Sequence, residues 1–422
     1  MSQKKSIAIL HLDLGIGGAE SLVVSIALAL KSKGHSIKIF TAHCDPSHAF
    51  EPVKDGTLDV TVVGRYIPRV IFGRFTVLLA VFRMLVICMY LFYLKMVHGI
   101  VFDVIFNDQV SAINPIIHYV LAGEKSIFYC HYPDAFLCTD RASWLKRLYR
   151  SPFDKLEAWT TCSVSVVLVN SLFTAGVIKR FVPSAVPLVL YPPCGETPGS
   201  ERILGVQEFP GLWNAETADG SAKLGSFDKF FLSLNRYERK KSIGVALEAF
   251  SAIKALGKTC LVIAGGYDPR VEENREHFAE LMDFSMRLQI ADRVVFLRSI
   301  KDLERKALMT QAIAVVYTPS GEHFGIVPCE AMALGTPVVA CNDGGPKESI
   351  INGETGWLCE DVPFVQSFAF AMEKATRLSS RERHRIAEQC KRRVAENFSL
   401  ETFACQLNEI VVMRLSDSPD KD

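Results

Sequence analysis

The sequence predicts an α/β protein of two domains, each built on a parallel sheet. The chain has 422 residues, which is more than one hydrophobic core usually serves. Each half contains short apolar runs separated by longer segments with helical periodicity, the pattern of parallel strands joined by crossover helices. A stretch rich in glycine, alanine, serine and acidic residues lies between the two series.

The first half opens with a strand, a glycine-rich turn and a helix. Residues 7–12 form an apolar run, and apolar residues then recur at helical spacing from Leu22 to Leu30, until Gly34 ends the pattern. This order is typical of a nucleotide-binding unit. Further strands are expected at 37–41, 101–106, 126–130 and 164–169.

The second half repeats this alternation. Strands are expected at 230–234, 260–264, 294–297, 314–317 and 337–340, with helical patterns such as 242–255 between them. From residue 379 charged helical segments lead to Leu415, and residues 416–422 have no apolar anchor.

These patterns predict the domain boundaries. The expected domains are residues 1–195 and 226–394. Residues 196–225 are expected to be a linker or an insertion, because their composition is the most linker-like in the chain, and 395–422 a C-terminal helix and tail.

Residues 75–94 in the first half form one long apolar segment that suggests a membrane. The segment is long enough to span a bilayer. Arg83 interrupts it, and a charge at that depth is costly unless the side chain snorkels or faces protein. Tyr90, Phe92 and Tyr93 suit a membrane interface. A span, a helix in the membrane plane and a buried core helix all remain open, with membrane contact favoured.

The overall charge argues against nucleic acid as a partner. Lys plus Arg number 47 and Asp plus Glu 46, a formal net charge of +1, so no global field recruits a polyanion. The 12 cysteines form no C-x-x-C pair, which argues against a disulfide framework and a structural zinc site. The N-terminus has no signal-peptide pattern, so a reducing compartment is expected.

Gly17 and Gly18 lie in the glycine-rich turn between the first strand and the first helix. Backbone N–H groups and the positive end of the helix can hold a phosphate there if no side chain blocks its approach. The spacing is not the G-x-G-x-x-G of dinucleotide folds, which argues against a dehydrogenase. For this motif alone, a glycine-rich turn without a ligand is an equal alternative.

A basic cluster follows the first strand of the second half. Arg236 comes directly after that strand, and Lys241 precedes a helical run. A planar guanidinium and a mobile ammonium together suit a diphosphate. The alternative is a solvated basic start of the helix, which would oppose the helix dipole. Arg239 and Lys240 are expected at the surface.

Two glutamates follow the predicted strand at 314–317. Glu322 is expected on the loop after that strand, at the carboxyl edge where open parallel sheets bind ligands, and Glu330 about two helical turns later. Their carboxylates can accept hydrogen bonds from sugar hydroxyls on different parts of one ligand. Free N–H groups around residues 324–327 can face phosphate oxygens.

The stretch from Glu322 to Ala340 resembles the donor-site signature of retaining glycosyltransferase family four. It reads Glu, seven residues, Glu, and then Ala-Met-Ala-x-Gly-x-Pro-Val-Val-Ala. The resemblance covers nearly the whole chain and implies the GT-B fold: two Rossmann-like domains that face each other across a cleft, with a C-terminal helical segment that crosses back to the first domain. Other matching pieces are Gly-Gly-Ala-Glu at 17–20, Val169-Asn170-Ser171, Asn235-Arg236 with Lys241, Ala-Gly-Gly at 264–266, and Gly344-Gly345-Pro346 with Glu348.

The resemblance also implies a role for each matching residue. Arg236 and Lys241 would hold the donor diphosphate, Glu322 the transferred sugar and Glu330 the ribose hydroxyls. His131 would lie near the sugar; without the family match, a buried histidine satisfied by backbone is the alternative. The implied catalytic residues are Glu322, Arg236, Lys241 and His131. The implied donor-binding residues are Gly17, Gly18, Arg236, Lys241, Gly266, Phe324, Gly325, Ile326, Val327 and Glu330.

Within that family, residues 11–20, 129–134, 145–150 and 235–241 look like enzymes that extend dolichol-linked oligosaccharides. The likeness implies GDP-mannose as donor and dolichyl-diphosphate chitobiose bearing one mannose as acceptor. One α-1,3 and one α-1,6 mannose would be added with retention of configuration. It implies catalytic domains on the cytosolic face of the endoplasmic reticulum membrane, allows a complex with other mannosyltransferases, and implies no metal or other cofactor.

Two alternatives stay open for the function. Another family-four enzyme with a different donor or lipid-linked acceptor would share the donor signature. A catalytically silent partner subunit would keep the fold but lose motif residues, whereas Arg236, Lys241, Glu322 and Glu330 are all present.

Overall fold

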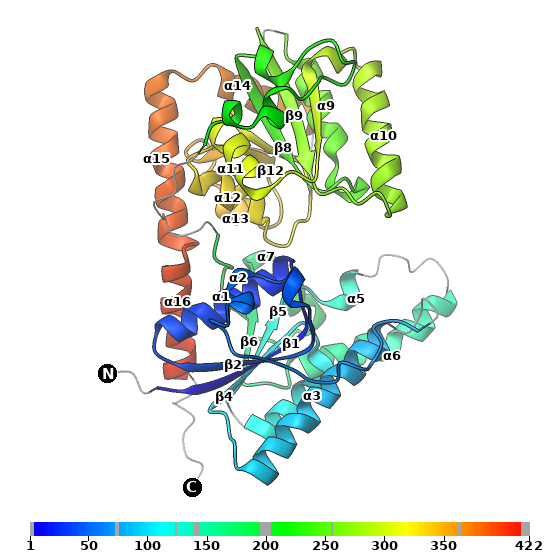
Figure 1. Ribbon diagram of the computed structural model, residues 1–422, viewed down its shortest axis with the longest axis vertical. Helices are drawn as coiled ribbons and strands as arrows, with labels where there is room; N and C mark the ends of the chain where they lie inside the picture. Colours follow the sequence, from blue (N-terminus) through cyan, green and yellow to red (C-terminus); the bar gives the residue numbers. More distant parts are fainter. Residues whose placement is uncertain are drawn as a thin grey trace. The chain divides into compact units, whose positions relative to one another are not determined.

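The computed structural model describes residues 4–71, 76–122, 125–137, 144–194, 204–254, 256–360 and 364–414. The chain divides into two compact units, Met1–Pro193 with Leu400–Asp422, and Cys194–Ser399. Phe75, residues 196–203 of the expected linker and the tail 416–422 lie outside the described residues. Each unit contains one parallel sheet (Figure 1).

The first unit is built on a seven-stranded parallel sheet in the order β3-β2-β1-β4-β5-β6-β7. The strand order reverses between β1 and β4, the switch point at which open α/β sheets bind ligands. The strands are β1 (Ser6–Leu14), β2 (Ser36–Cys44), β3 (Val60–Val62), β4 (Val104–Asp108), β5 (Ser126–Cys130), β6 (Val166–Val169) and β7 (Leu188–Val189).

Helices cover both faces of this sheet. α1 (Gly18–Ser32) and α16 (Leu400–Glu409) pack together on one face, where Leu30 and Leu407 are completely buried. α3 (Thr76–His98) packs on the other face. Because α16 belongs to the first unit, the expected return of the C-terminal segment is confirmed. The other helices of this unit include α2 (Glu51–Lys54), α4 (Asn114–Ile116), α5 (Asp134–Leu137), α6 (Trp144–Thr161) and α7 (Leu172–Phe181).

The second unit is built on a six-stranded parallel sheet in the order β10-β9-β8-β11-β12-β13, with its switch point between β8 and β11. The predicted α/β class with two Rossmann-like domains is therefore confirmed. The strands are β8 (Lys229–Leu234), β9 (Thr259–Gly265), β10 (Val294–Arg298), β11 (Val315–Tyr317), β12 (Val338–Cys341) and β13 (Gly356–Cys359). The helices include α8 (Pro210–Trp213), α9 (Ile243–Ala252), α10 (Glu272–Arg287), α11 (Asp302–Gln311), α12 (Ile326–Ala333), α13 (Pro346–Ser349), α14 (Phe364–Thr376) and α15 (Ser380–Asn397).

The described part of the expected linker, residues 204–225, is folded into the second unit. Thr217 forms an antiparallel bridge with Val295 of β10. Val206, Leu212 and Leu224 are buried. These isolated apolar side chains anchor a segment whose average composition resembles a flexible linker, so of the two expected alternatives, linker or insertion, the described residues fit an insertion.

α3 is the long apolar segment of the sequence, and its two faces differ. The inner face packs into the core through Met84, Ile87 and Leu91. Arg83 also faces protein: its side chain is 3% exposed and its Nη1 donates to Asp13 Oδ2 at 3.1 Å. The charge in the apolar run is thus neutralised by a carboxylate near the end of β1. By length and composition α3 could still cross a membrane.

Candidate functional site

The donor-side candidates meet at the switch point of the second sheet. The loop after β8 carries Arg236 and Lys241, and the loop after β11 carries Glu322. Because β8 and β11 are neighbours, these loops lie side by side. Lys241 Nζ donates to Glu322 Oε2 at 2.6 Å, and the two side chains are 13% and 24% exposed. Two residues 81 positions apart thus form one charge pair.

The pair fixes the charge state of Glu322. Burial alone would raise the pKa of Glu322, but the Lys241 ammonium and the hydrogen bonds from Lys241 and the Tyr317 hydroxyl outweigh burial and lower it. Glu322 is therefore ionised at neutral pH. A ligand anion that attracts Lys241 would compete with this carboxylate for the same ammonium group.

Tyr237 holds the loop that carries the two cations. Its hydroxyl is hydrogen-bonded to the carbonyl oxygens of Ile263 and Leu297, both at 3.0 Å, and its ring is completely buried. Asn274 of α10 donates to the Tyr237 carbonyl at 3.1 Å. This anchoring presents Arg236 and Lys241 on a fixed segment, which lowers the cost of ordering them around a ligand.

The basic residues of this loop take different directions. Arg236 is 63% exposed and pairs with Glu238 at 2.7 Å. Arg239 instead turns to α10 and pairs with Glu276 and Glu280. Arg239 is therefore a surface residue, as predicted, and Arg236 is the more available guanidinium for an anion.

Gly265, the last residue of β9, and Gly266 directly after it allow Arg236 to pass close to the sheet edge. A Cβ on Gly265 would lie 1.9 Å from the Asn235 carbonyl oxygen, and one on Gly266 would lie 3.3 Å from Arg236 Cγ. The close approach of these backbones explains the glycines sterically. Gly266 therefore lies next to the proposed diphosphate site through its contact with Arg236.

The start of α12 is shaped by glycines on both sides. Gly325 caps the helix with φ +79°, a conformation that favours glycine. The first N–H groups of the helix, including those of Ile326 and Val327, have no partner within it, so they are available to an anion. The Phe324 side chain is buried and its ring packs against Phe398, so its part in a donor site is limited to the backbone.

Gly344 and Gly345 press directly on the loop that carries Glu322. The Gly345 N–H donates to the Glu322 carbonyl oxygen at 2.8 Å. A Cβ on Gly344 would lie 2.3 Å from that same oxygen, and one on Gly345 would lie 2.1 Å from the Phe324 carbonyl oxygen. Both glycines are thus required for the position of the loop.

Replacing Gly345 by alanine is expected to push this loop away and destabilise the protein. The added methyl group cannot be accommodated without moving backbone, which costs about 1–3 kcal/mol in well-packed regions. Thermal unfolding measures the destabilisation. Gly211→Ala is the control for a glycine-to-alanine change without a clash, because an added Cβ there meets open space and neither Gly211 nor Gly345 has positive φ. Equal losses in both variants would contradict the steric explanation.

Glu330 lies on α12 and has a partner that the sequence did not indicate. Arg305 of α11 donates to Glu330 Oε2 at 2.6 Å and to Asp302 Oδ1 at 2.7 Å. Glu330 is 20% exposed. Arg305 therefore fixes the orientation of the carboxylate that was predicted to bind ribose hydroxyls.

His131 in the first unit belongs to a buried cluster of three side chains at the carboxyl edge of the sheet. Asp108 at the end of β4 is completely buried and bonds two histidines: His131 Nε2 at 2.7 Å and His11 Nδ1 at 2.9 Å. His131 follows β5 and is 27% exposed, so it is the member that reaches the surface. Among the described residues, no partner is found for the buried Nε2 of His11.

Asp108 controls the protonation of this cluster. Burial alone would raise the pKa of Asp108, but the adjacent histidines lower it to about 2. Burial alone would lower the pKa of His131, but Asp108, with a smaller effect of Glu20, raises it above the usual value. The alternative prediction, that backbone groups satisfy this side chain, is wrong: a carboxylate does so. Asp108 and His11 were not identified from the sequence.

Gly17 and Gly18 stand at the start of α1, after β1. Gly17 is the N-cap, and a Cβ there would meet only the end of the Glu20 side chain, at 2.3 Å, among its nearest described neighbours. An added Cβ on Gly18 meets open space. The fold itself places little demand for glycine at these positions, which leaves close approach of a ligand as a reason for them.

The structure thus assembles two groups of candidate residues, one in each unit. Lys241 pairs with Glu322 in the second, and His131 pairs with Asp108 in the first. Within the described ranges, no set of three histidine, cysteine or acidic residues is arranged to hold a metal ion.

Parallel sheets in both units, with a cation and a carboxylate at the switch point of the second, fit a glycosyltransferase of the GT-B class, and the family matches show that the chain is one. Residues 16–193 match the family Glycosyltransferase Family 4, and residues 216–393 match Glycosyl transferases group 1. The chain belongs to the α-1,3/1,6-mannosyltransferase family, because its similarity to members of that family extends over almost its whole length.

Two relatives carry this assignment, and one solved structure shows the likeness of the fold. The chain is 41% identical to Alpha-1,3/1,6-mannosyltransferase ALG2 of Dictyostelium discoideum, over 96% of this chain and 97% of that protein. The protein of the same name from Homo sapiens is also 41% identical, over 98% of this chain and 97% of its own length. Sucrose-phosphate synthase from Thermosynechococcus elongatus matches the fold with a TM-score of 0.70 at 20% identity, over 96% of this chain and 98% of that one.

Proposed function

We propose that this enzyme transfers mannose from GDP-mannose to a dolichyl-diphosphate chitobiose that already carries one mannose, adding an α-1,3 and an α-1,6 mannose. The observation that carries the proposal is the Lys241–Glu322 pair at the switch point of the second sheet. A diphosphate would draw Lys241 away from Glu322, and the freed carboxylate would accept hydrogen bonds from mannose hydroxyls. The names of the relatives support mannose as the sugar.

In this proposal the bond from the mannose anomeric carbon to the diphosphate breaks as the acceptor hydroxyl attacks from the same face. The acceptor proton passes to the departing diphosphate, so the anomeric configuration is retained without an enzyme nucleophile. Arg236 and Lys241 stabilise the charge that develops on the leaving group, and the N–H groups at the start of α12 add to this effect. Glu330, oriented by Arg305, binds the ribose.

Product analysis tests the proposal. The purified protein in liposomes is given GDP-mannose and a lipid-diphosphate chitobiose bearing one mannose, and the lipid products are measured by mass and linkage analysis. Growth by two mannoses, abolished by Glu322→Ala, is the expected result. Release of GDP without acceptor growth would show that the acceptor is wrong. Consumption of a different sugar nucleotide instead would overturn the mannose assignment.

We further propose that no metal ion takes part, because Arg236 and Lys241 supply the positive charge that a metal would otherwise provide at the diphosphate. Transfer is therefore expected to continue at an unchanged rate after dialysis against a chelator. The initial rate with and without added Mg²⁺ or Mn²⁺ measures this. A loss of most of the activity, restored by one of these ions, would contradict the prediction.

We also propose that the outer face of α3 rests on the membrane that holds the acceptor, the endoplasmic reticulum membrane with the catalytic units on its cytosolic side. Phe82, Met89 and Met96 share one face, since they are seven residues apart, and they are 50%, 59% and 65% exposed. The inner face is part of the protein core. A helix with one protein face and one apolar outer face suits the plane of the membrane better than a span.

The triple substitution of Phe82, Met89 and Met96 by serine is expected to weaken liposome binding by at least tenfold. Burying three large apolar side chains in lipid contributes roughly 1.5–3 kcal/mol each at full burial. Flotation with neutral liposomes measures binding. Val186→Ser is the control, because Val186 of the same unit is 79% exposed but lies outside α3. Unchanged flotation of the triple variant would contradict the in-plane placement.

A further inference from the structure

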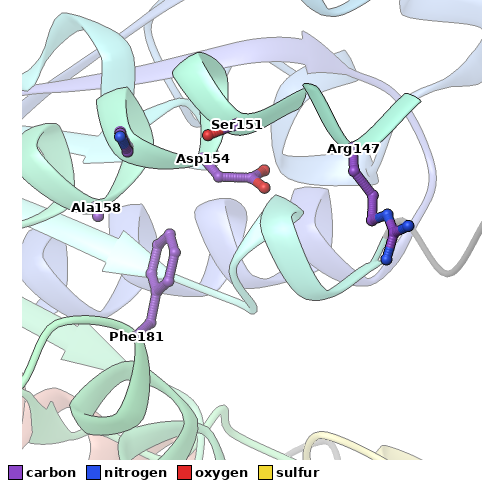
Figure 2. Close-up of a pocket in the computed structure, with 6 residues that line it drawn as sticks. Arg147, Ser151, Asp154, Ala158 and Phe181 are labelled. Atoms are coloured by element: carbon purple, nitrogen blue, oxygen red, sulfur yellow. The ribbon is translucent and has the colours of Figure 1, made fainter. Parts of the chain in front are cut away.

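The first unit contains an open hollow of about 490 Å³ between α6 and the end of α7, separate from the candidate residues described above. Figure 2 shows the Phe181 ring facing α6, with the Arg147 guanidinium extending from the same helix. The hollow is lined by Arg147, Ser151, Asp154, Lys155, Ala158 and Phe181.

Two cations of the hollow are available to an anion. Arg147 and Lys155 form no ion pair with any other part of the chain that the structure describes. Ser151 adds a hydroxyl group between them along the helix. Asp154 is the opposing charge, so the lining keeps one positive charge in excess. An Arg fork and a Lys ammonium on one face of a helix suit phosphate oxygens, which favour both groups.

An exposed apolar stripe runs along α6 beside the hollow. Leu148, Leu156 and Trp159 are 64%, 44% and 59% exposed. Each follows a lining residue, Arg147, Lys155 or Ala158, by one position, which is a rotation of about 100° around the helix. The polar lining and the apolar stripe are therefore adjacent. This arrangement matches an amphiphile with an anionic head and an isoprenoid chain.

The hollow is also connected to the segment that follows His131. Phe181 contacts Phe136 of α5 edge to face, with ring centroids 5.5 Å apart. Glu157 of α6 accepts hydrogen bonds from the backbone N–H groups of Asp134 and Ala135, at 2.7 and 2.9 Å. α6 thus holds the start of α5, three residues after His131.

We propose that this hollow binds the diphosphate of the lipid-linked acceptor, with Arg147 and Lys155 contacting the phosphates and the isoprenoid chain lying along Leu148, Leu156 and Trp159. The isoprenoid chain and the diphosphate rest on the proposed function, whereas the general class of the ligand, an amphiphile with an anionic phosphate head, rests on the side chains themselves. Binding here would place the head of the acceptor beside the segment that follows β5.

The first test measures binding of farnesyl diphosphate by equilibrium dialysis. The Arg147→Gln/Lys155→Gln variant is expected to bind it about tenfold more weakly, because two charge-assisted contacts are lost. Lys179→Gln/Arg180→Gln is the matched control, since these cations lie on α7 outside the lining. Equal affinity of the wild type and the first variant, or an equal loss in both variants, would overturn the proposal.

A second experiment tests whether the hollow binds the lipid-linked acceptor or the headgroups of bilayer phospholipids. If the first variant loses binding to phosphatidylserine vesicles but keeps its affinity for farnesyl diphosphate, the hollow serves phospholipid and the proposal is overturned. Farnesyl diphosphate carries no sugar and the assay needs no transfer, so a failure of the mannose assignment leaves this result interpretable. In the transfer assay the variant is expected to raise KM for the lipid acceptor about tenfold, with kcat within twofold.

Discussion

Replacing Lys241 by alanine is expected to lower kcat/KM for mannose transfer by about a hundredfold to a thousandfold, the usual effect of removing one donor that stabilises charge in a transition state. Lys241 is 13% exposed and lies 2.6 Å from Glu322, so its ammonium acts in a partly desolvated site. Its removal takes away stabilisation of the leaving diphosphate and leaves the Glu322 carboxylate without its closest cation. Steady-state kinetics at saturating acceptor measure the effect.

The matched control for this variant is Lys240→Ala. Lys240 is the preceding residue, but its side chain is 68% exposed and pairs with Glu238 instead. Because an exposed ion pair contributes about 0–1 kcal/mol, this variant is expected to keep most of its activity. If both variants lost activity to the same degree, a general effect of positive charge in the loop would explain the data better than a specific role of Lys241.

The strands that the sequence predicted and those it missed differ in one respect. All predicted strands lie in the sheets, and several of those with a neighbour on both sides are continuous buried runs, such as β5 and β9. The three that were missed, β3, β7 and β13, are edge strands. Their lengths are three, two and four residues. β3 and β7 are also only partly buried, so they lack the continuous apolar run by which the equally short β11 could be recognised.

Some of the site residues could be identified from the sequence and others could not. Glu322 and Lys241 could be identified because each stands in a motif that directly follows a predicted strand. Arg305 and Asp108 could not, because their importance depends on a partner distant in the chain. Asp108 bonds His11 across 97 positions. That contact exists only because β1 and β4 are neighbours at the switch point, and strand order cannot be read from local patterns.

Arg83 shows the same limit for the apolar segment. Its charge made the depth of residues 75–94 ambiguous, since a lone arginine in an apolar run is compatible with lipid, surface or protein. The partner that Arg83 has in the structure, Asp13, lies 70 positions earlier, near the end of β1. The hydropathy of the segment shows that a charged residue interrupts the apolar run, but it cannot show which carboxylate neutralises that charge.

Replacing Asp108 by asparagine is expected to lower kcat about tenfold to a hundredfold, the size of loss typical when a metal-binding histidine loses its carboxylate partner. The substitution keeps the size of the side chain but removes the charge that raises the pKa of His131. The pKa of His131 is therefore expected to fall, and the alkaline limb of the pH–rate profile to move to lower pH. An NMR titration of the His131 ring measures the pKa without relying on activity.

The sign of the stability effect follows from the direction of each pKa shift. The pKa of His131 is raised, so its attraction to Asp108 stabilises the fold fully below about pH 6.5 and is lost as the pH rises through the raised value. The pKa of Asp108 is lowered to about 2, so its contribution is present above about pH 4 and is lost as the pH falls through about 2. The asparagine variant should therefore show a flatter dependence of unfolding on pH.

A double-mutant cycle shows whether Asp108 acts through His131 or independently. If it acts through the histidine, Asp108→Asn combined with His131→Gln should be no less active than His131→Gln alone, because the second substitution has already removed the group that the carboxylate orients. Additive losses would mean that Asp108 supports transfer by another route, through His11 or through the packing at the end of β4. If Asp108 has only a structural role, the alkaline limb of the pH–rate profile should not shift in the asparagine variant. If Asp108 controls the charge of His131, the limb should move to lower pH.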